Sequence, residues 1–399
     1  WRRAASWRRR SRRSRTRWAR WRAAEAPADA AWRAHWGRLG AALEAEAACG
    51  RRWRPAGREG RLLKMLCRRG VPREHRWRVW YLVSGAAARC QAAGEGTYAA
   101  LAARLDELDR SVAAQIEGDL HRTFPTHPIL DNPAGLAALH RVLGALALRD
   151  PEVGYVQGIN FVAGLHLVVQ ASRPAGGPLT GGAGGGPGGG PGGGGRGGEA
   201  GSRAGLANGA PAAGVLDADA EERVFWILVC AIEDFMYRGC FAQDLNGCHV
   251  EQRVLMALIH RKLPRVARRM EELECNIILF TTEWFLCLYS RSLPPETVAR
   301  IWDAFLLEGS KILFRVALAL FKTIARPLAE ARSMSDMLTL TKEVARDCHD
   351  RQRLMQVAFT GLGSMPMARI TRVRAKMQEE VDRDLYQYRK RGESQDNNQ

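Results

Sequence analysis

The sequence predicts an all-α protein with one large domain, and three observations favour this class. Between residues 62 and 322, apolar side chains recur at spacings of three and four, as on one face of a helix. Strand-like alternation is scarce over the same stretch. Breaks that contain proline interrupt the pattern, which predicts helices of ordinary length joined by short connections. The breaks lie at Pro72, Pro125, Pro151, Pro264 and Pro294.

The first 61 residues are predicted to form a basic arm and a helical lead-in to this domain. Residues 1–22 hold eleven arginines and no acidic residue, so more than half of the net charge of +18 lies there. This arm mixes arginine with tryptophan, and we expect it to be disordered. Residues 23–50 are rich in alanine, with Trp32, Trp36 and Leu39 at a spacing that favours an amphipathic helix.

The predicted domain covers residues 62–325 and contains one long insertion, residues 173–214. The insertion consists mainly of glycine, proline and alanine; it has almost nothing to bury, so we expect it to be disordered. It separates two apolar helical segments, residues 158–170 and 221–234. Because the free energy of loop closure grows only logarithmically with length, these segments can still pack as neighbours. This favours one domain with an insertion over two domains with a linker.

Residues 326–390 are predicted to form a helical extension, and residues 391–399 a disordered tail. Apolar residues in the extension make one stripe along a charged helix, and the stripe spans barely two heptads. This length favours a helix docked on the domain over a coiled-coil partner site. The stripe consists of Ile370, Val373, Met377, Val381 and Leu385.

Several classes of protein and site are disfavoured by the sequence. No apolar run approaches the roughly 18–20 residues of a transmembrane helix. The nine cysteines are scattered and never spaced C-x-x-C, which predicts free thiols in a reducing compartment rather than disulfides or a zinc site. Common catalytic and nucleotide-binding motifs are absent. The G-x-G-x-x-G matches inside the glycine tract neither follow a strand nor open a helix.

Three short segments of the domain, residues 70–85, 116–128 and 150–167, carry paired residues at notable spacings. Taken singly, each pair has a structural explanation. For the first pair it is stacking of a guanidinium on a ring, for the second an i,i+3 ion pair, and for the third an amide that satisfies backbone groups at a helix start. The pairs are Arg76 with Trp80, Asp119 with Arg122, and Tyr155 with Gln157.

Together and in this order, the three segments resemble the signatures R-x-x-x-W, I-x-x-D-x-x-R and Y-x-Q of the TBC domain family of Rab GTPase-activating proteins. A further match to the family lies downstream, at Arg300, Trp302 and Asp303. The resemblance covers roughly residues 62–325 and is greatest to the growth-hormone-regulated and family-2 types. The glycine-rich insertion and the basic arm depart from the family pattern.

The resemblance implies a single multi-helix TBC domain that accelerates GTP hydrolysis by a Rab-family GTPase. Arg122 would be the arginine finger and Gln157 the glutamine finger, both supplied in trans. Asp119 would orient Arg122, and Tyr155 would help to place the glutamine loop. The alternative is a catalytically silent TBC-like scaffold that binds a GTPase without accelerating hydrolysis.

The same resemblance implies the remaining expectations. Arg76 and Trp80 would be scaffold for the two loops, more structural than catalytic. No cofactor or metal of the chain's own is expected, because GTP and Mg²⁺ would belong to the GTP-bound Rab partner. We expect a role in vesicle trafficking, a cytoplasmic location with peripheral association at endomembranes, and no nucleic-acid partner.

Overall fold

The computed structural model describes residues 57–172, 216–237, 239–242 and 244–396, together with Trp36 and residues 39–40 and 42–45. Every regular element among these residues is a helix and none is a strand, which confirms the predicted all-α class. The basic arm predicted for residues 1–22 and the insertion predicted for residues 173–214 lie outside the described residues.

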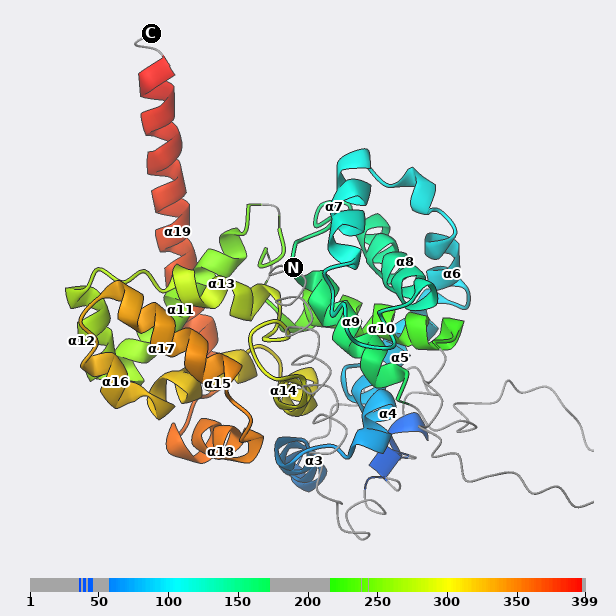
Figure 1. Cartoon of the computed structure of the whole chain (residues 1–399), viewed down its shortest axis with the longest axis horizontal. Coiled ribbons are helices and arrows are strands. Elements are labelled where there is room, and N and C mark those ends of the chain that lie inside the picture. Colours follow the sequence, from blue (N-terminus) through cyan, green and yellow to red (C-terminus); the bar gives the residue numbers. More distant parts are fainter. Residues whose placement is uncertain are drawn as a thin grey trace, which may run out of the picture.

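From α3 to α9, and again from α10 to α19, the helices follow one another with short connections (Figure 1). The first half contains α3 (Gly57–Arg69), α4 (Arg73–Val83), α5 (Ala86–Ala93), α6 (Thr97–Ala102), η1 (Leu105–Glu107), α7 (Arg110–Leu120), α8 (Pro133–Arg149), α9 (Ile159–Gln170), α10 (Ala218–Cys230) and η2 (Ala231–Phe235). The second half contains α11 (Asn246–Lys262), α12 (Pro264–Glu272), α13 (Ile278–Leu286), α14 (Pro295–Glu308), α15 (Lys311–Thr323), α16 (Ala325–Ala329), α17 (Met334–Arg346), α18 (Arg351–Gln356), η3 (Val357–Gly361) and α19 (Met367–Asp396).

Helix α14 occupies the centre of the molecule. All of its residues from Pro295 to Leu306 are buried, because the helix has neighbours on every side. It packs against α3 and α4 on one flank and against α15 and α18 on the other. Figure 1 shows α4 to α10 on one side of α14, and α11, α12 and α15 to α18 on the opposite side. A single hydrophobic cluster runs through both groups of helices.

The two helices that flank the glycine-rich insertion are neighbours in space. Helix α9 ends at Gln170 and α10 begins at Ala218, yet the two pack against each other. Eleven of the twelve residues of α9 are buried. The segment that carries the predicted glutamine loop at its start is therefore fixed in the core along its whole length.

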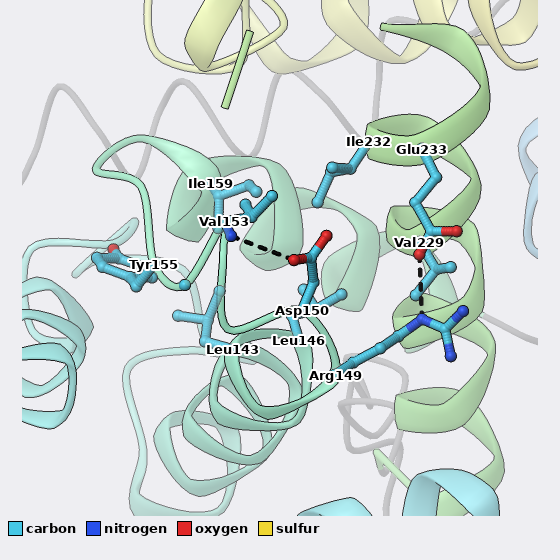
Figure 2. Close-up of a pocket in the computed structure, with 11 residues that line it drawn as sticks. Leu143, Leu146, Arg149, Asp150, Val153, Tyr155, Ile159, Val229, Ile232 and Glu233 are labelled. Carbon is cyan, nitrogen blue, oxygen red and sulfur yellow. Dashed lines mark hydrogen bonds and ion pairs between the residues drawn. The ribbon is translucent and has the colours of Figure 1, made fainter. Parts of the chain in front are cut away.

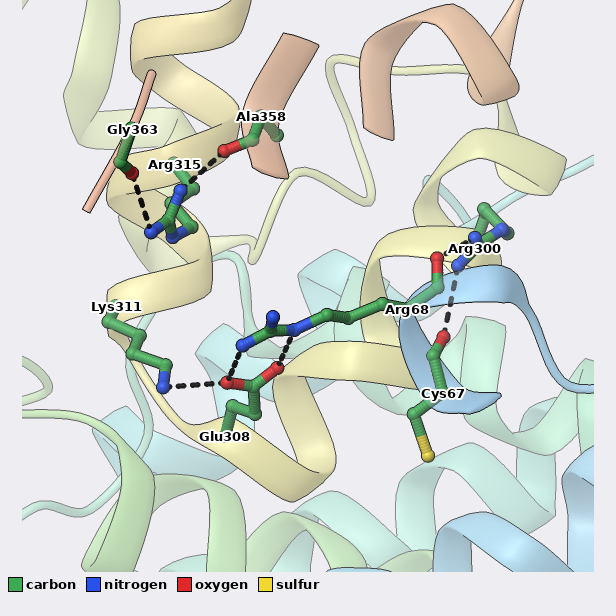
Figure 3. A network of polar contacts seen from close by, with 8 residues as sticks. All are labelled: Cys67, Arg68, Arg300, Glu308, Lys311, Arg315, Ala358 and Gly363. Carbon is green, nitrogen blue, oxygen red and sulfur yellow. Dashed lines mark hydrogen bonds and ion pairs between the residues drawn. The ribbon is translucent and has the colours of Figure 1, made fainter. Parts of the chain in front are cut away.

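A buried polar network joins α3, α14, α15 and η3 (Figure 3). Glu308 accepts hydrogen bonds from Arg68 at 2.6 and 2.7 Å and pairs with Lys311 at 2.6 Å. Its side chain is fully buried. Burial alone would raise the pKa of Glu308, but the hydrogen bonds from Arg68 and Lys311 hold it below its usual value. The charged carboxylate thus holds α3 against the end of α14.

Helix α19 is docked over its first half, as the apolar stripe predicted. The Arg374 guanidinium binds both oxygens of buried Glu251, at 2.5 and 2.7 Å, and Tyr237 donates to Gln378 at 2.9 Å. The second half projects from the body of the molecule (Figure 1). The helix continues to Asp396, past the boundary expected at residue 390, and residues 397–399 lie outside the described residues.

The part of the chain that the structure describes lacks a membrane-spanning helix and a metal-binding cluster. None of the described helices is long and apolar enough to cross a bilayer. The described residues contain no group of three or more His, Cys, Asp or Glu side chains that could hold a metal ion. The eight cysteines among them are free thiols, six of them buried.

Candidate functional site

Arg122 projects from the turn that follows α7. The helix starts at an Asp109 cap, whose carboxylate accepts the backbone N–H of Ser111 at 2.8 Å. It ends at Leu120, two residues before Arg122, and the chain reverses at Phe124, which has a left-handed φ of +46°. The Arg122 side chain is 51% exposed. A sharp, packed turn thus presents a solvent-facing guanidinium.

Asp119, one turn before Arg122, is buried and uses both carboxylate oxygens. Oδ1 forms an ion pair with Arg122 Nη2, as the i,i+3 spacing predicted. Oδ2 accepts a hydrogen bond from the Tyr155 hydroxyl at 2.5 Å. Because Tyr155 lies two residues before Gln157, one carboxylate connects the arginine turn to the glutamine loop.

The glutamine loop joins α8 to α9 through two left-handed glycines. Gly154 has φ +59° and Gly158 has φ +114°. A Cβ added to Gly158 would lie 2.8 Å from Cys287 Sγ, so only glycine fits this position without displacing a neighbour. Gln157 is exposed between buried Val156 and buried Gly158. The loop therefore holds the backbone in the core and leaves the amide in solvent.

A packed apolar floor supports this loop (Figure 2). The cavity beneath it is only about 20 Å³ and is lined by side chains of α8, α9 and α10. That volume holds about one water molecule, so the cavity is no ligand site. Asp150 accepts the backbone N–H of Val153 at 3.2 Å, and Arg149 pairs with Glu233 at 3.1 Å. These contacts fix the start of the loop to α8 and η2.

The electrostatics of the site keep Tyr155 as a hydrogen-bond donor. Burial raises the pKa of the Tyr155 phenol well above its usual value, although the nearby Arg122 guanidinium opposes the shift. Burial also raises the pKa of the Cys287 thiol to about 12. Cys287 is therefore a protonated packing residue under Gly158 and no nucleophile.

The structure places Arg76 and Trp80 away from both exposed side chains. Both donate to Asp303 of α14, Arg76 at 3.0 and 3.2 Å and Trp80 at 2.9 Å, and all three residues are buried. Trp80 also packs edge-on against His166 of α9, whose ring stacks on Trp302 with a centroid distance of 4.4 Å. Trp80 therefore contacts the glutamine helix directly through His166, and α4 packs against α9.

The model of the Rab-GTPase-TBC domain matches residues 73–328, about two thirds of the chain. The chain belongs to this family. The match ends within α16, so the described TBC domain contains both loops and the central helix α14.

The relatives include both types expected from the sequence. TBC1 domain family member 2A from Mus musculus is 31% identical over 326 residues, which is 81% of this chain and 30% of the relative. Growth hormone-regulated TBC protein 1 from Xenopus tropicalis is 30% identical over 322 residues, 79% of this chain and 78% of the relative. The chain thus spans less than a third of the first relative and most of the second.

Solved structures agree with the helical architecture. The Chlamydomonas flagellar RabGAP TBC domain is 31% identical and superposes with a TM-score of 0.60, covering 78% of this chain and 88% of that one. The Ypt/Rab-GAP domain of Gyp1p is 20% identical with a TM-score of 0.56, covering 75% of this chain and 90% of that one. At that identity the second likeness concerns the fold alone.

Some residues that build the site of this TBC domain are not identified by motif spacing. Thr123 and Asn160 are fully buried between the two loops and bonded to each other at 2.7 Å. Cys287 comes from the far end of α13, and its contact with Gly158 joins segments distant in sequence. The one signal in the sequence is that both polar residues lie close to the motifs: Thr123 directly follows Arg122, and Asn160 lies three residues after Gln157.

Proposed function

We propose that this TBC domain accelerates GTP hydrolysis by a Rab-family GTPase, with Arg122 and Gln157 as residues supplied in trans. The observation that carries the proposal is the arrangement around Asp119. One buried carboxylate pairs with Arg122 and bonds to Tyr155, so it holds the two loops together. The two functional side chains themselves remain exposed, where a partner can reach them.

Arginine suits the charge that develops in phosphoryl transfer. The γ-phosphoryl group passes through a loose transition state in which charge moves toward the departing GDP. A planar guanidinium stays charged at all relevant pH values and can donate two parallel hydrogen bonds. An arginine supplied in trans accelerates hydrolysis by about 10³–10⁵-fold. Asp119 pre-orients the Arg122 side chain, so less conformational entropy is lost on engagement.

Glutamine suits the attacking water. Its amide donates and accepts hydrogen bonds, so it can hold a water molecule in line with the γ-phosphorus. Gln157 precedes Gly158 in a loop anchored on both sides by buried residues, which restricts where the amide can reach. GTP and Mg²⁺ would be bound by the GTPase, and the domain would contribute only these two side chains to the chemistry.

The partner surface is proposed to extend from the two loops to Arg291. This side chain is 58% exposed, and its guanidinium lies 5.6 Å from the ring centroid of Phe161, which follows Gln157 by one helical turn. Phe161 in turn meets the Phe124 ring edge-on at 5.6 Å. Arg291 also pairs with Glu283 at 3.3 Å, so charges of both signs lie beside two half-buried rings, and such a mixed polar and apolar surface suits a protein partner.

Single-turnover hydrolysis with a panel of GTP-loaded Rab GTPases tests the proposal. Wild-type protein should stimulate at least one of them. Arg122→Lys keeps the charge but loses the planar fork, so stimulation should fall by about 10²-fold or more while GTPase binding survives. Gln157→Ala should cause a comparable loss. Binding without stimulation by wild type would instead support a silent scaffold, and equal rates for Arg122→Lys would remove Arg122 from the mechanism.

A further inference from the structure

The side-chain amide of Asn160 forms hydrogen bonds with Thr123 and Gly158, the residues that directly follow the two proposed finger residues. Asn160 lies in the first turn of α9 and is fully buried. Its Oδ1 accepts the backbone N–H of Gly158 at 3.1 Å, and its Nδ2 donates to Thr123 Oγ1 at 2.7 Å. Gly158 follows Gln157 directly, and Thr123 follows Arg122 directly.

The chemistry of the partners fixes the orientation of this amide. The Thr123 hydroxyl donates its only proton to the backbone carbonyl of Asp119 at 2.7 Å, so it can only accept from Asn160. The Gly158 N–H can only donate. Asn160 satisfies both needs at once with one acceptor and one donor. An aspartate or an aliphatic residue of similar size would satisfy at most one of them.

Close packing makes this connection rigid. A Cβ added to Gly164, one turn along α9 from Asn160, would lie 2.8 Å from Thr123 Cγ2 and 3.2 Å from the Phe124 ring. The arginine turn therefore presses directly on the backbone of α9. Phe124 also packs edge-on against Phe161 of the same helix. Movement of the turn relative to α9 would break these contacts together.

We infer that Asn160 is a positioning residue that sets the separation of Arg122 and Gln157 by holding Thr123 and Gly158 on one amide. This link uses neither the Asp119 carboxylate nor the Tyr155 hydroxyl, because it joins the residues on the other side of each finger; from Asp119 it involves only the backbone carbonyl that accepts from Thr123. Asn160 touches neither reacting group and acts through its neighbours. The inference rests on the proposed function for its kinetic consequence but not for its structural one.

Thr123→Val tests the link with little change in volume, because it replaces only the hydroxyl with a methyl group. Thr281→Val is the matched control. Thr281 is also fully buried and donates to the carbonyl four residues before it, at 2.8 Å, but the described residues offer its hydroxyl no asparagine donor. Thr123→Ser restores the hydroxyl and should restore wild-type behaviour.

The first readout is independent of GTPase activity. Hydrogen exchange of the Gly158 amide should accelerate by about tenfold in Thr123→Val, because Asn160 loses one of its two anchors, and should not change in Thr281→Val. Equal exchange in Thr123→Val and wild type would overturn the inference, whatever the activity of the protein. Faster exchange in both valine variants would also overturn it, since the effect would then be general loosening.

The second readout is single-turnover hydrolysis on a responsive Rab. The rate constant at saturating TBC protein should fall by about tenfold to a hundredfold in Thr123→Val, with the half-saturating concentration unchanged within about twofold. Thr281→Val should match wild type. If wild type stimulates no Rab, the proposed function fails, while the Gly158 exchange result still supports or overturns the positioning role.

Discussion

Tyr155 donates a 2.5 Å hydrogen bond to Asp119, the same carboxylate that pairs with Arg122. These two residues are separated by 36 positions in sequence: Asp119 lies in the last turn of α7, and Tyr155 lies in the loop before α9. The bond is buried, so both partners depend on it to satisfy a polar group removed from water. It makes the geometry of the arginine turn conditional on the geometry of the glutamine loop.

Tyr155→Phe should separate this connection from packing, because it removes the hydroxyl and keeps the ring. Loss of a hydrogen bond to a buried charged group should lower the free energy of unfolding by about 1.5–3 kcal/mol. The stimulated rate should fall by about tenfold, since Asp119 would lose one of its anchors. Urea unfolding and single-turnover hydrolysis measure the two effects.

Tyr98→Phe is the matched control for Tyr155→Phe. The Tyr98 hydroxyl also donates to a buried carboxylate, Glu221 Oε2 at 2.8 Å, but Tyr98 belongs to α6. A similar loss of stability with an unchanged stimulated rate is expected. If both variants lose activity in proportion to stability, the Tyr155 bond has no specific role at the site.

The all-α class and the breaks between helices could be predicted from the sequence, because both depend on local periodicity and on proline. Helix α12 begins at the predicted break at Pro264, and α14 begins at Pro295, directly after the predicted break at Pro294. The ion pair between Asp119 and Arg122 was also accessible, since it joins residues three apart on one helical turn.

Contacts between distant segments could not be predicted in the same way. Nothing in local spacing shows that Asp303 accepts from Trp80, a residue 223 positions away. Nor does it show that Asn160 and Thr123 share a hydrogen bond. The role expected for Trp80 as scaffold for the loops stays a prediction, and the structure offers a route for it through His166 of α9.

Asp303→Asn should strongly destabilise the fold, because Asp303 compensates a buried guanidinium. Arg76 is 3% exposed and binds both oxygens of Asp303, which also accepts from Trp80 and from the backbone of Val71. Breaking a buried ion pair by neutralising one partner costs about 3–5 kcal/mol. Urea unfolding should show a correspondingly lower midpoint.

An exposed ion pair gives the comparison for Asp303→Asn. Arg326→Ala, which breaks the contact with Glu330, should leave the unfolding midpoint unchanged. A small effect of Asp303→Asn would mean that Arg76 finds other compensation.

The free energy of unfolding of the domain should fall as the pH drops below about 6.5, because of His166. Burial lowers the pKa of His166 to about 3, and its Nδ1 has no hydrogen-bond partner. In the unfolded chain the pKa is roughly 6.5, so between these values only the unfolded state takes up the proton. Stability from this residue is therefore complete above about pH 6.5 and is lost progressively toward pH 3.

His166→Phe keeps a ring beside Trp302 and removes the titration. Between pH 7.5 and 5.0, wild type should lose about 2 kcal/mol more unfolding free energy than the variant. Urea unfolding at the two pH values measures the difference, and the remaining histidines contribute equally to both proteins. An identical pH dependence would show that His166 becomes protonated in the folded state without cost.

Gly158→Ala should damage the site through two separable effects. The left-handed backbone, with φ +114°, disfavours any side chain, and the new Cβ would lie 2.8 Å from Cys287 Sγ. Together these should displace the loop and lower the stimulated rate by about tenfold or more. Gly154→Ala provides the comparison, because φ is +59° there but the nearest atom, the Pro151 carbonyl oxygen, is 3.8 Å away.

Adding Cys287→Ala to Gly158→Ala removes the sulfur atom that the new methyl group would meet. The double variant should recover part of the lost rate, and what remains lost should be the contribution of backbone strain. A double-mutant cycle over the two positions measures this coupling, since residues in contact are not additive. If Cys287→Ala gives no recovery, strain alone governs the loop, and Gly154→Ala should then impair hydrolysis to a similar degree. If Cys287→Ala restores the rate in the Gly158→Ala background but not in the Gly154→Ala background, the tight contact with the end of α13 sets where Gln157 can reach.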